Sequence, residues 1–209
     1  MRNPKRPIPR EFYNRDPRLV APDLLGKVLV RRESSTILAG RIVEVEAYLG
    51  QDDAAAHSAV GRTPRNAVMF GPPGHVYVYF IYGNHYCLNV SCLPVGVAGA
   101  VLFRALAPLQ GIEEMVKARE IAVNSPRDLR KLTSGPGRLA EAFGITRIRD
   151  NGKDLTSAKS DLYIAEDGYR PAQISTTVRI GITKAAHLPF RYLIPDNDFV
   201  SGPRGKRAR

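Results

Sequence analysis

The feature that most constrains the fold is the alternation of side chains over residues 75–90, HVYVYFIYGNHYCLNV. Successive side chains of a β-strand point to opposite faces. The apolar face of the first strand holds Val76, Val78 and Phe80, and the other face holds the ring-bearing polar residues His75, Tyr77 and Tyr79. Gly83 marks a turn, after which a second strand returns. The segment therefore predicts a β-hairpin, and with it an antiparallel sheet.

The rest of the chain predicts more strands than helices. Strand patterns occupy residues 40–50 (GRIVEVEAYLG), 99–109 (GAVLFRALAPL) and 174–182 (ISTTVRIGI). Helical patterns occupy residues 110–122, residues 134–145 and a short stretch that breaks at Gly26 and leads into a strand. Tight turns join some of the strands. We therefore expect an α+β fold, a single domain with a central, largely antiparallel curved β-sheet flanked by helices.

The net charge of +11 is concentrated at the two ends of the chain. Residues 1–10 carry four basic residues and no acid, and so do residues 201–209, which leaves +3 for the body (11 − 8). Basic tails of this kind add salt-sensitive contacts to phosphates, although they can also serve solubility alone. We expect a basic flexible arm at residues 1–11, one folded domain at 12–201 and a basic flexible tail at 202–209.

Composition argues against several other classes of protein. The 209 residues can build one sizeable core, and no apolar run approaches the ~18 residues of a membrane span. Cys87 and Cys92 are too few for a disulfide framework, and no Cys/His cluster indicates zinc. We expect no metal, no small-molecule cofactor and no membrane partner. Without an apolar stretch behind its basic N-terminus, the chain fits a cytoplasmic, nucleoid-associated bacterial protein, and a nuclear location is left open.

The strand at residues 40–50 places two carboxylates and a tyrosine on one face. The core-suited face holds Val43, Val45, Ala47 and Leu49, and the opposite face holds Ile42, Glu44, Glu46 and Tyr48. A solvated outer face would explain the glutamates alone, whereas the neighbouring tyrosine also fits a cleft with an apolar wall. A carboxylate beside aromatic rings loses solvation, and it can act as a base if its charged form keeps a partner.

Three other polar residues allow both a structural and a functional interpretation. Arg104 interrupts the apolar strand VLFRAL and needs an acidic or phosphate partner, for which Glu46 is the obvious candidate. Asn89, in the strand CLNVSC, could close a backbone bond or contact the edge of a base. His57, in the loop AAAHSAVG, could equally be polar surface. The hairpin tyrosines are likewise either ordinary β-formers or a platform for stacking nucleobases.

Seven segments of the chain resemble the alkyladenine (3-methyladenine) DNA glycosylases. They are, in order, RIVEVEAYLG, AAHS, TPRNAVMF, YVYFIYGNHYCLNVS, VLFRALAPL, SGPGRLAEAFGI and RIGITKAAHLPFRY. The likeness runs from about residue 12 to about residue 201, and the EAY and YVYxIYG motifs in series are far more specific than any short motif. The NHY run after Gly83 and the insertion CLPVGVAG depart from the family's pattern.

The resemblance implies chemical roles for four positions. Glu46 matches the family's general base, which activates a water for attack on C1′ of the deoxyribose. Arg104 and the main-chain carbonyl of Ile180 match groups that help hold that water. Tyr82 matches the wedge that enters the minor groove and takes the place of the extruded base in the stack.

The resemblance also implies a pocket for the extruded base. Tyr48, His57 and Tyr79 match the residues that enclose the base. Asn89 matches a selectivity residue, which disfavours guanine because the exocyclic 2-amino group of guanine would meet it.

The function implied by the resemblance is base excision repair of DNA. A monofunctional hydrolase would flip an alkylated or deaminated purine out of the duplex, cleave its N-glycosidic bond and leave an abasic site. Its partner would be double-stranded DNA with a damaged purine, bound by a monomer. The order of preference among 3-methyladenine, 7-methylguanine, hypoxanthine and ethenoadenine is left open.

Two alternatives to this function compete with it. A non-catalytic nucleic-acid-binding protein would use the same tyrosines and basic tails, but it leaves Glu46 unexplained because a carboxylate near phosphate weakens binding. A hydrolase of free nucleosides would leave the wedge tyrosine and the basic tails unexplained, since neither helps with a small substrate.

Overall fold

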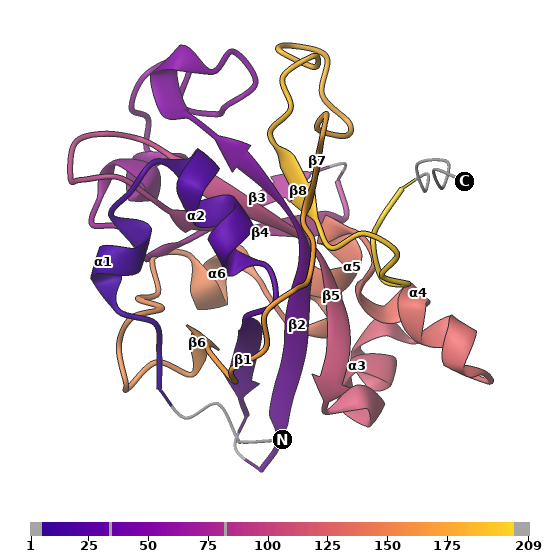
Figure 1. Cartoon of the computed structure of the whole chain (residues 1–209). Helices are drawn as coiled ribbons and strands as arrows, with labels where there is room; N and C mark the ends of the chain where they lie inside the picture. The colour runs from indigo at the N-terminus through magenta and orange to yellow at the C-terminus, as the bar shows by residue number, and fades with distance from the viewer. Residues whose placement is uncertain (1–5, 34, 82, 203–209) are drawn as a thin grey trace.

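The computed structural model describes residues 6–33, 35–81 and 83–202, which form a mixed α+β structure (Figure 1). The strands are β1 (Val28–Arg32), β2 (Ile37–Tyr48), β3 (Val76–Ile81), β4 (His85–Ser91), β5 (Ala100–Gln110), β6 (Leu162–Ala165), β7 (Ser175–Thr177) and β8 (Arg191–Leu193). The α-helices are α1 (Arg10–Tyr13), α2 (Pro17–Leu24), α3 (Ile112–Arg119), α4 (Arg130–Thr133), α5 (Pro136–Ala142) and α6 (Arg147–Asp150). Three 3₁₀ turns are η1 (Gly50–Asp52), η2 (Ala67–Phe70) and η3 (Pro126–Leu129).

The eight strands form one sheet, in which every pair of neighbouring strands is antiparallel. Its main order is β3-β4-β5-β2-β1-β6, and β8 pairs with both β2 and β7. The 12-residue strand β2 shares one edge between β1 and β8 and pairs with β5 along the other edge. In Figure 1, α1, α2 and α6 lie on one side of β2, and α3, α4 and α5 lie on the other. The predicted fold class is confirmed.

Most predicted elements form where their patterns placed them, and the short ones differ. The strand predicted at residues 174–182 ends at Thr177, and residues 178–182 continue as irregular backbone. Neither β6 nor β8 was predicted, because strands of four and three residues are too short to show a period. Gly83 adopts a left-handed conformation at the hairpin turn, with φ of 75°, as a two-strand reversal of this kind favours.

Two residues depart from the predicted alternation of core and outer faces. Ile42 was expected to point away from the core, yet it is fully buried in the main hydrophobic cluster beside Val43. Register shifts between Ile42 and Glu44, and between Glu44 and Val45, interrupt the pairing of β2 with β5. A bulge of this kind resets which side chains face inward. Phe80, expected in the core, is 47% exposed and contacts Tyr86 near the end of the hairpin.

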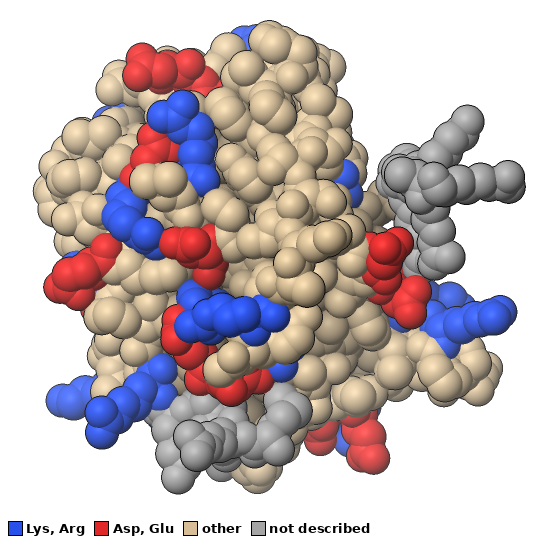
Figure 2. Space-filling view, viewed as in Figure 1, with Lys and Arg blue, Asp and Glu red and all other residues tan. Residues whose placement is uncertain are grey.

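Residues 6–11, which the sequence assigned to the basic arm, lie against the sheet. Pro7 forms a bridge with Ala165, and the N–H of Ile8 donates to the carbonyl of Ile164 at 2.8 Å. The side chain of Ile8 is buried in the main core. The domain boundaries after residues 11 and 201 stay predictions. The exposed charges on the face drawn in Figure 2 are mixed in sign, with Lys and Arg beside Asp and Glu.

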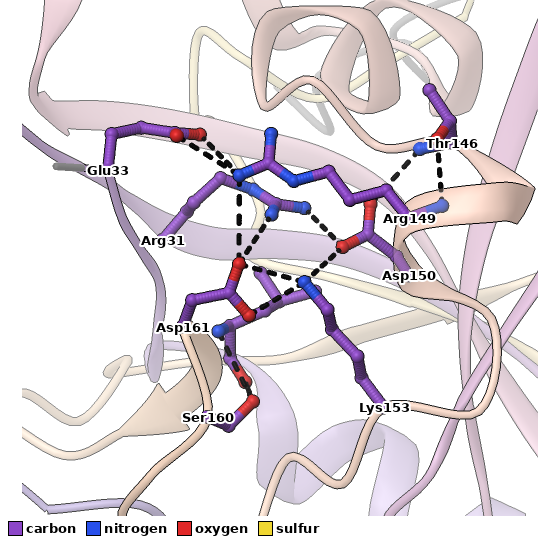
Figure 3. A network of polar contacts seen from close by, with 9 residues as sticks. Arg31, Glu33, Thr146, Arg149, Asp150, Lys153, Ser160 and Asp161 are labelled. Carbon is purple, nitrogen blue, oxygen red and sulfur yellow. Dashed lines mark hydrogen bonds and ion pairs between the residues drawn. The ribbon is translucent and has the colours of Figure 1, made fainter.

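A network of buried and half-buried ion pairs ties β1 to α6 (Figure 3). Arg31 and Asp150 are both fully buried and lie 2.9 Å apart. Lys153 approaches Asp150 at 2.9 Å and Asp161 at 2.7 Å, and Arg31 also reaches Asp161 at 3.3 Å. At the rim of this network, Arg149 pairs with Glu33 at 2.9 Å. We call Arg31, Asp150, Lys153 and Asp161 the β1–α6 cluster.

Residues 151–153, directly after α6, cover the free edge of β3, the strand that holds Tyr77 and Tyr79. The chain that follows α6 runs along β3, where the N–H of Val76 donates to the carbonyl of Lys153 at 2.9 Å. The N–H of Gly152 donates to the carbonyl of Val76 at 2.7 Å, and Asn151 accepts from the N–H of Val78 at 3.0 Å. An edge strand covered in this way is protected from pairing with other chains and holds its side chains in register.

Candidate active site

One pocket of about 620 Å³ opens beside the tyrosine hairpin and collects most of the sequence-predicted site residues. Its walls come from β2, β3, β4 and β5, from the loop that holds His57, and from the segments at residues 134–138, 180–182 and 201–202. The predicted residues on its lining are Tyr48, His57, Tyr79, Asn89, Arg104 and Ile180. A pocket of this size can bury a flat ring system of the size of a nucleobase.

Glu46 is fully buried directly behind three of these lining residues. Its Oε1 accepts from the N–H of Ile180 at 2.8 Å and lies 3.2 Å from Nη1 of Arg104. Its Oε2 accepts from the hydroxyl of Tyr48 at 2.9 Å. Burial raises the pKa of Glu46, and the Arg104 charge and the two hydrogen bonds only partly oppose that rise. The carboxylate is thus held by donors that favour its charged form, in surroundings that make it a stronger base than a solvated glutamate.

Glu44 takes most of the available donors in this region. Its Oε1 accepts from Nε of Arg104 at 2.9 Å, from Nε of Arg191 at 2.7 Å and from the Ser201 hydroxyl at 2.9 Å. Its Oε2 accepts from the N–H of Ser201 at 2.5 Å. We call Glu44, Glu46, Arg104, Arg191 and Ser201 the pocket cluster. The sequence expectation that Arg104 pairs with Glu46 is met, but the closer contact of Arg104 is to Glu44.

Aromatic rings form one wall of the pocket. The centroid of the His57 ring lies 4.4 Å from that of Tyr79, with the ring planes at 83°. Nδ1 of His57 lies 3.0 Å from the hydroxyl of Tyr77, which is buried between the pocket and a small cluster around Met69. Burial of the His57 ring and the nearby Arg65 charge lower the pKa of His57. His57 is therefore neutral near pH 7, and it brings no positive charge to the pocket.

The phenols of the wall are also neutral. Burial raises the pKa of Tyr79 far above its ordinary value, and burial beside the Glu46 carboxylate does the same for Tyr48. Asn89 is 4% exposed, and its side-chain amide donates to the carbonyl of Tyr77 at 3.1 Å. The backbone bond considered for Asn89 is thus present, and the residue still lines the pocket.

Two of the roles that the sequence predicted, those of the Ile180 carbonyl and of Tyr82, are not tested by the structure. Ile180 contacts Glu46 through its N–H, whereas the sequence assigned a role to its carbonyl, and that role stays a prediction. Tyr82, expected as the wedge, lies outside the described residues.

Sequence reasoning missed a buried ion pair next to the pocket, Arg179 with Asp53. The guanidinium binds both carboxylate oxygens, Nη1 at 2.5 Å and Nη2 at 2.9 Å. Arg179 lies in TTVRIGI, an arginine inside an apolar pattern, which is the signal that singled out Arg104. Its partner lies 126 residues earlier in the chain, so the contact itself could not be found from spacing.

Several features of the described residues bear on cofactors and membranes. Within residues 6–33, 35–81 and 83–202 there is no group of three or more His, Cys, Asp or Glu side chains that could hold a metal ion. No helix in the same ranges is long and apolar enough to cross a bilayer. The described lining of the pocket contains no lysine.

The fold and the pocket together define a class of protein, one with an antiparallel sheet that places a buried carboxylate behind an aromatic pocket wall. Comparison with known proteins identifies the family. Residues 11–198 match the model of the methylpurine-DNA glycosylase family. The chain belongs to that family, which confirms the resemblance seen in the sequence.

Curated bacterial relatives match over nearly the full chain, and each carries the provisional name 3-methyladenine DNA glycosylase. A protein of Koribacter versatilis is 64% identical over 198 residues, which cover 95% of this chain and 94% of the relative. One of Burkholderia lata is 49% identical over 201 residues, covering 96% and 93%. One of Carboxydothermus hydrogenoformans is 46% identical over 195 residues, covering 93% and 98%.

Proposed function

We propose that this chain is a DNA repair glycosylase that hydrolyses the N-glycosidic bond of alkylated or deaminated purines in duplex DNA. The product would be the free base and an abasic site. Family membership supports the reaction class. The observation that carries the proposal for this chain is Glu46, a buried carboxylate with a raised pKa, held against an aromatic pocket by Arg104, Tyr48 and Ile180.

In the proposed mechanism, Glu46 acts as general base on water. As the bond from C1′ to the purine nitrogen breaks, its electron pair leaves with the base and the sugar gains oxocarbenium character. Anionic Glu46 stabilises that positive charge and accepts one proton from the water that attacks C1′. Arg104 and the carbonyl of Ile180 would hold that water. The second proton of the water stays on the new C1′ hydroxyl.

The pocket supports selection for damaged purines in two ways. Alkylation at N3 or N7 makes the base cationic, and a cation between Tyr48, Tyr79 and His57 would gain roughly 0.5–2 kcal/mol from the ring faces. A cationic base is also a better leaving group, so chemistry adds to selection. Asn89, fixed by its bond to the Tyr77 carbonyl, would meet the 2-amino group of guanine and disfavour it.

Duplex DNA is the partner that the remaining features favour. A purine inside a duplex must be extruded before its glycosidic bond can be reached, at a cost of a few kcal/mol. Tyr82 is proposed to fill the vacated place in the stack. The basic ends of the chain would add phosphate contacts. We further propose that a monomer suffices, because a single lesion has no two-fold symmetry.

The reaction is proposed to be hydrolysis alone, without strand cleavage. A lyase forms a Schiff base through an amine nucleophile, and the described pocket lining offers no lysine. Borohydride trapping of a covalent enzyme–DNA adduct would contradict this part of the proposal.

The test is single-turnover base release from a duplex that carries one hypoxanthine or one ethenoadenine, with methylated DNA as a further substrate. Wild type should release the base. Glu46→Gln should bind the damaged duplex and release base at least ~100-fold more slowly, within the usual range for loss of a general base. Glu113→Gln, the same change at an exposed position on α3, is the matched control and should behave as wild type. Full release by Glu46→Gln would overturn the assignment of the base.

A further inference from the structure

The segment that brings Ile180 to Glu46 has no regular secondary structure of its own. It follows β7, which ends at Thr177, and remains irregular until β8 begins at Arg191. Val178, at its start, is 47% exposed, whereas Arg179 is only 3% exposed. A surface loop of this kind is free to move unless side chains anchor it.

Arg179 is anchored through both of its terminal nitrogens and through ring contacts. Its guanidinium makes a bidentate ion pair with Asp53, and both side chains are fully buried. It stacks over the ring of Tyr48, at 4.6 Å from the centroid, and over that of Phe190, at 5.3 Å. Nη1 also donates to the carbonyl of Ala47 at 3.0 Å. A planar guanidinium held in this way has one orientation.

Asp53 connects Arg179 to the backbone of the pocket wall. Besides Arg179, it accepts from the N–H of Leu49 at 3.2 Å and from that of Ala55 at 3.1 Å. These bonds close the turn that connects Tyr48, at the end of β2, to His57. The pair therefore joins the two backbone segments that present Tyr48 and the Ile180 N–H to the Glu46 carboxylate.

Stability alone does not account for such a pair. Two charges taken out of water regain little net energy, and apolar replacements of buried ion pairs are often as stable. A fixed geometry is what the pair adds. We propose that Arg179 and Asp53 are positioning residues, which hold the Ile180 N–H and the Tyr48 hydroxyl on Glu46 and so set the reactivity of its carboxylate. The inference rests on the proposed role of Glu46.

The pH dependence of base release can report this role. Charged and titratable groups face Glu46 from β2, β4, β5, β8 and the irregular segment, namely Glu44, Tyr48, Cys87, Arg191, Arg104 and Arg179. The Ile180 N–H and the Tyr48 hydroxyl both lower the pKa of Glu46 against the effect of burial. If the anchor loosens, those bonds lengthen and the pKa of Glu46 rises. Because Glu46 acts ionised, the acid limb of the rate profile then moves to higher pH.

Two variants test this while conserving every charge. Arg179→Lys keeps the cation but cannot bind two carboxylate oxygens at once, and Asp53→Glu keeps the anion but displaces it by one methylene. Each should slow single-turnover base release at least ~10-fold at pH 7 and move the acid limb upward by at least about 0.5 pH unit. Binding of the hypoxanthine duplex, measured by fluorescence anisotropy, should stay near the wild-type value.

The chain offers a matched control in Arg41, which makes a two-pronged pair with Asp167 at 3.1 and 2.7 Å and stacks over Tyr169 at 4.2 Å. Arg41→Lys removes the same kind of contact away from the pocket and should leave the rate profile unchanged. An unchanged rate and acid limb in folded Arg179→Lys and Asp53→Glu would overturn the inference, and so would an equal shift in Arg41→Lys. Glu46→Gln, measured in parallel, separates the two proposals. If it retains activity, the base assignment has failed rather than the positioning role.

Discussion

The pocket cluster and the β1–α6 cluster both pair carboxylates with basic side chains, but the pKa of a carboxylate is raised in the first and lowered in the second. Each buries carboxylates against arginines within the sheet region. In the β1–α6 cluster, Asp150 has Arg31 and Lys153 each at 2.9 Å, and the N–H of Thr146 donates to its other oxygen at 3.1 Å. In the pocket cluster, Glu44 collects four donor contacts, and Glu46 keeps one guanidinium at 3.2 Å.

The difference teaches that the balance between burial and favourable donors separates a structural carboxylate from a reactive one. Burial opposes ionisation of Asp161, yet its bond from Lys153 and the Arg31 charge outweigh it and lower its pKa. At Glu46 the balance is reversed, and burial raises the pKa. Glu46 keeps the Ile180 N–H, the Tyr48 hydroxyl and one guanidinium, but burial outweighs them and makes it basic enough to accept a proton.

The largest effect is expected at Arg104, because it pairs with both the structural carboxylate Glu44 and the reactive carboxylate Glu46. Arg104→Met removes the guanidinium from both Glu44 and Glu46. Base release should fall about 10²–10³-fold. The unfolding free energy should also fall, by about 3 kcal/mol, because the buried carboxylates lose a partner. Single-turnover kinetics and urea denaturation measure the two losses, and a variant that kept the full rate would show that Arg104 is only structural.

The next effect separates stability from activity. Arg31→Met leaves Asp150 with Lys153 as its remaining cation, so the unfolding free energy should fall by about 3 kcal/mol. Base release by the folded protein at 25 °C should match wild type, since no member of the β1–α6 cluster lines the pocket. A rate loss that persists well below the melting temperature would mean that the two clusters are coupled through β3.

Acid should inactivate the enzyme before it unfolds it. The pKa of Glu46 is raised, so base release should fail as the pH drops through a value above the ordinary carboxyl value of ~4.3. The pKa of Asp161 is lowered, so its stabilising effect is present above its unfolded value and is lost only as the pH falls below ~4. Rate and far-ultraviolet circular dichroism, measured across pH 3–8 with an enzyme-free duplex as control, should therefore diverge. Coincident transitions would contradict the different states assigned to the two clusters.

The smallest effect is expected at the rim of the β1–α6 cluster. Arg149 pairs with Glu33 at 2.9 Å, and both side chains are 37% exposed. Arg149→Ala should change the unfolding free energy by less than about 1 kcal/mol, because a solvated pair gains little. Urea denaturation of Arg149→Ala and Arg31→Met in parallel would show whether the buried or the exposed pairs of the cluster contribute most to the unfolding free energy. A loss at the rim as large as that in Arg31→Met would show that burial does not decide the contribution.

Local sequence patterns predicted much of the sheet and several residues of the site. Alternation along β2 placed Glu44, Glu46 and Tyr48 together, and an arginine in an apolar strand pointed to Arg104. Alternation failed at Ile42, where a bulge that depends on the partner strand changed the inward face.

The contacts that distinguish Glu44 from Glu46 lay beyond such reasoning. Glu44 binds Arg191 and Ser201, which are 147 and 157 residues away along the chain. Arg191 reaches Glu44 from the three-residue strand β8, and Ser201 reaches it from irregular backbone near the end of the described chain. Neither segment has a period that marks it. Only the folded backbone brings such donors together.

The central claim is that Glu46 serves chemistry and the β1–α6 cluster serves stability. The most direct test measures base release from a hypoxanthine duplex and the unfolding free energy for the same two variants, Glu46→Gln and Arg31→Met. Glu46→Gln should lose at least ~100-fold in rate and keep its stability within about 1 kcal/mol. Arg31→Met should show the reverse. The account would be contradicted if Glu46→Gln released base at the wild-type rate, or if both variants lost rate and stability together.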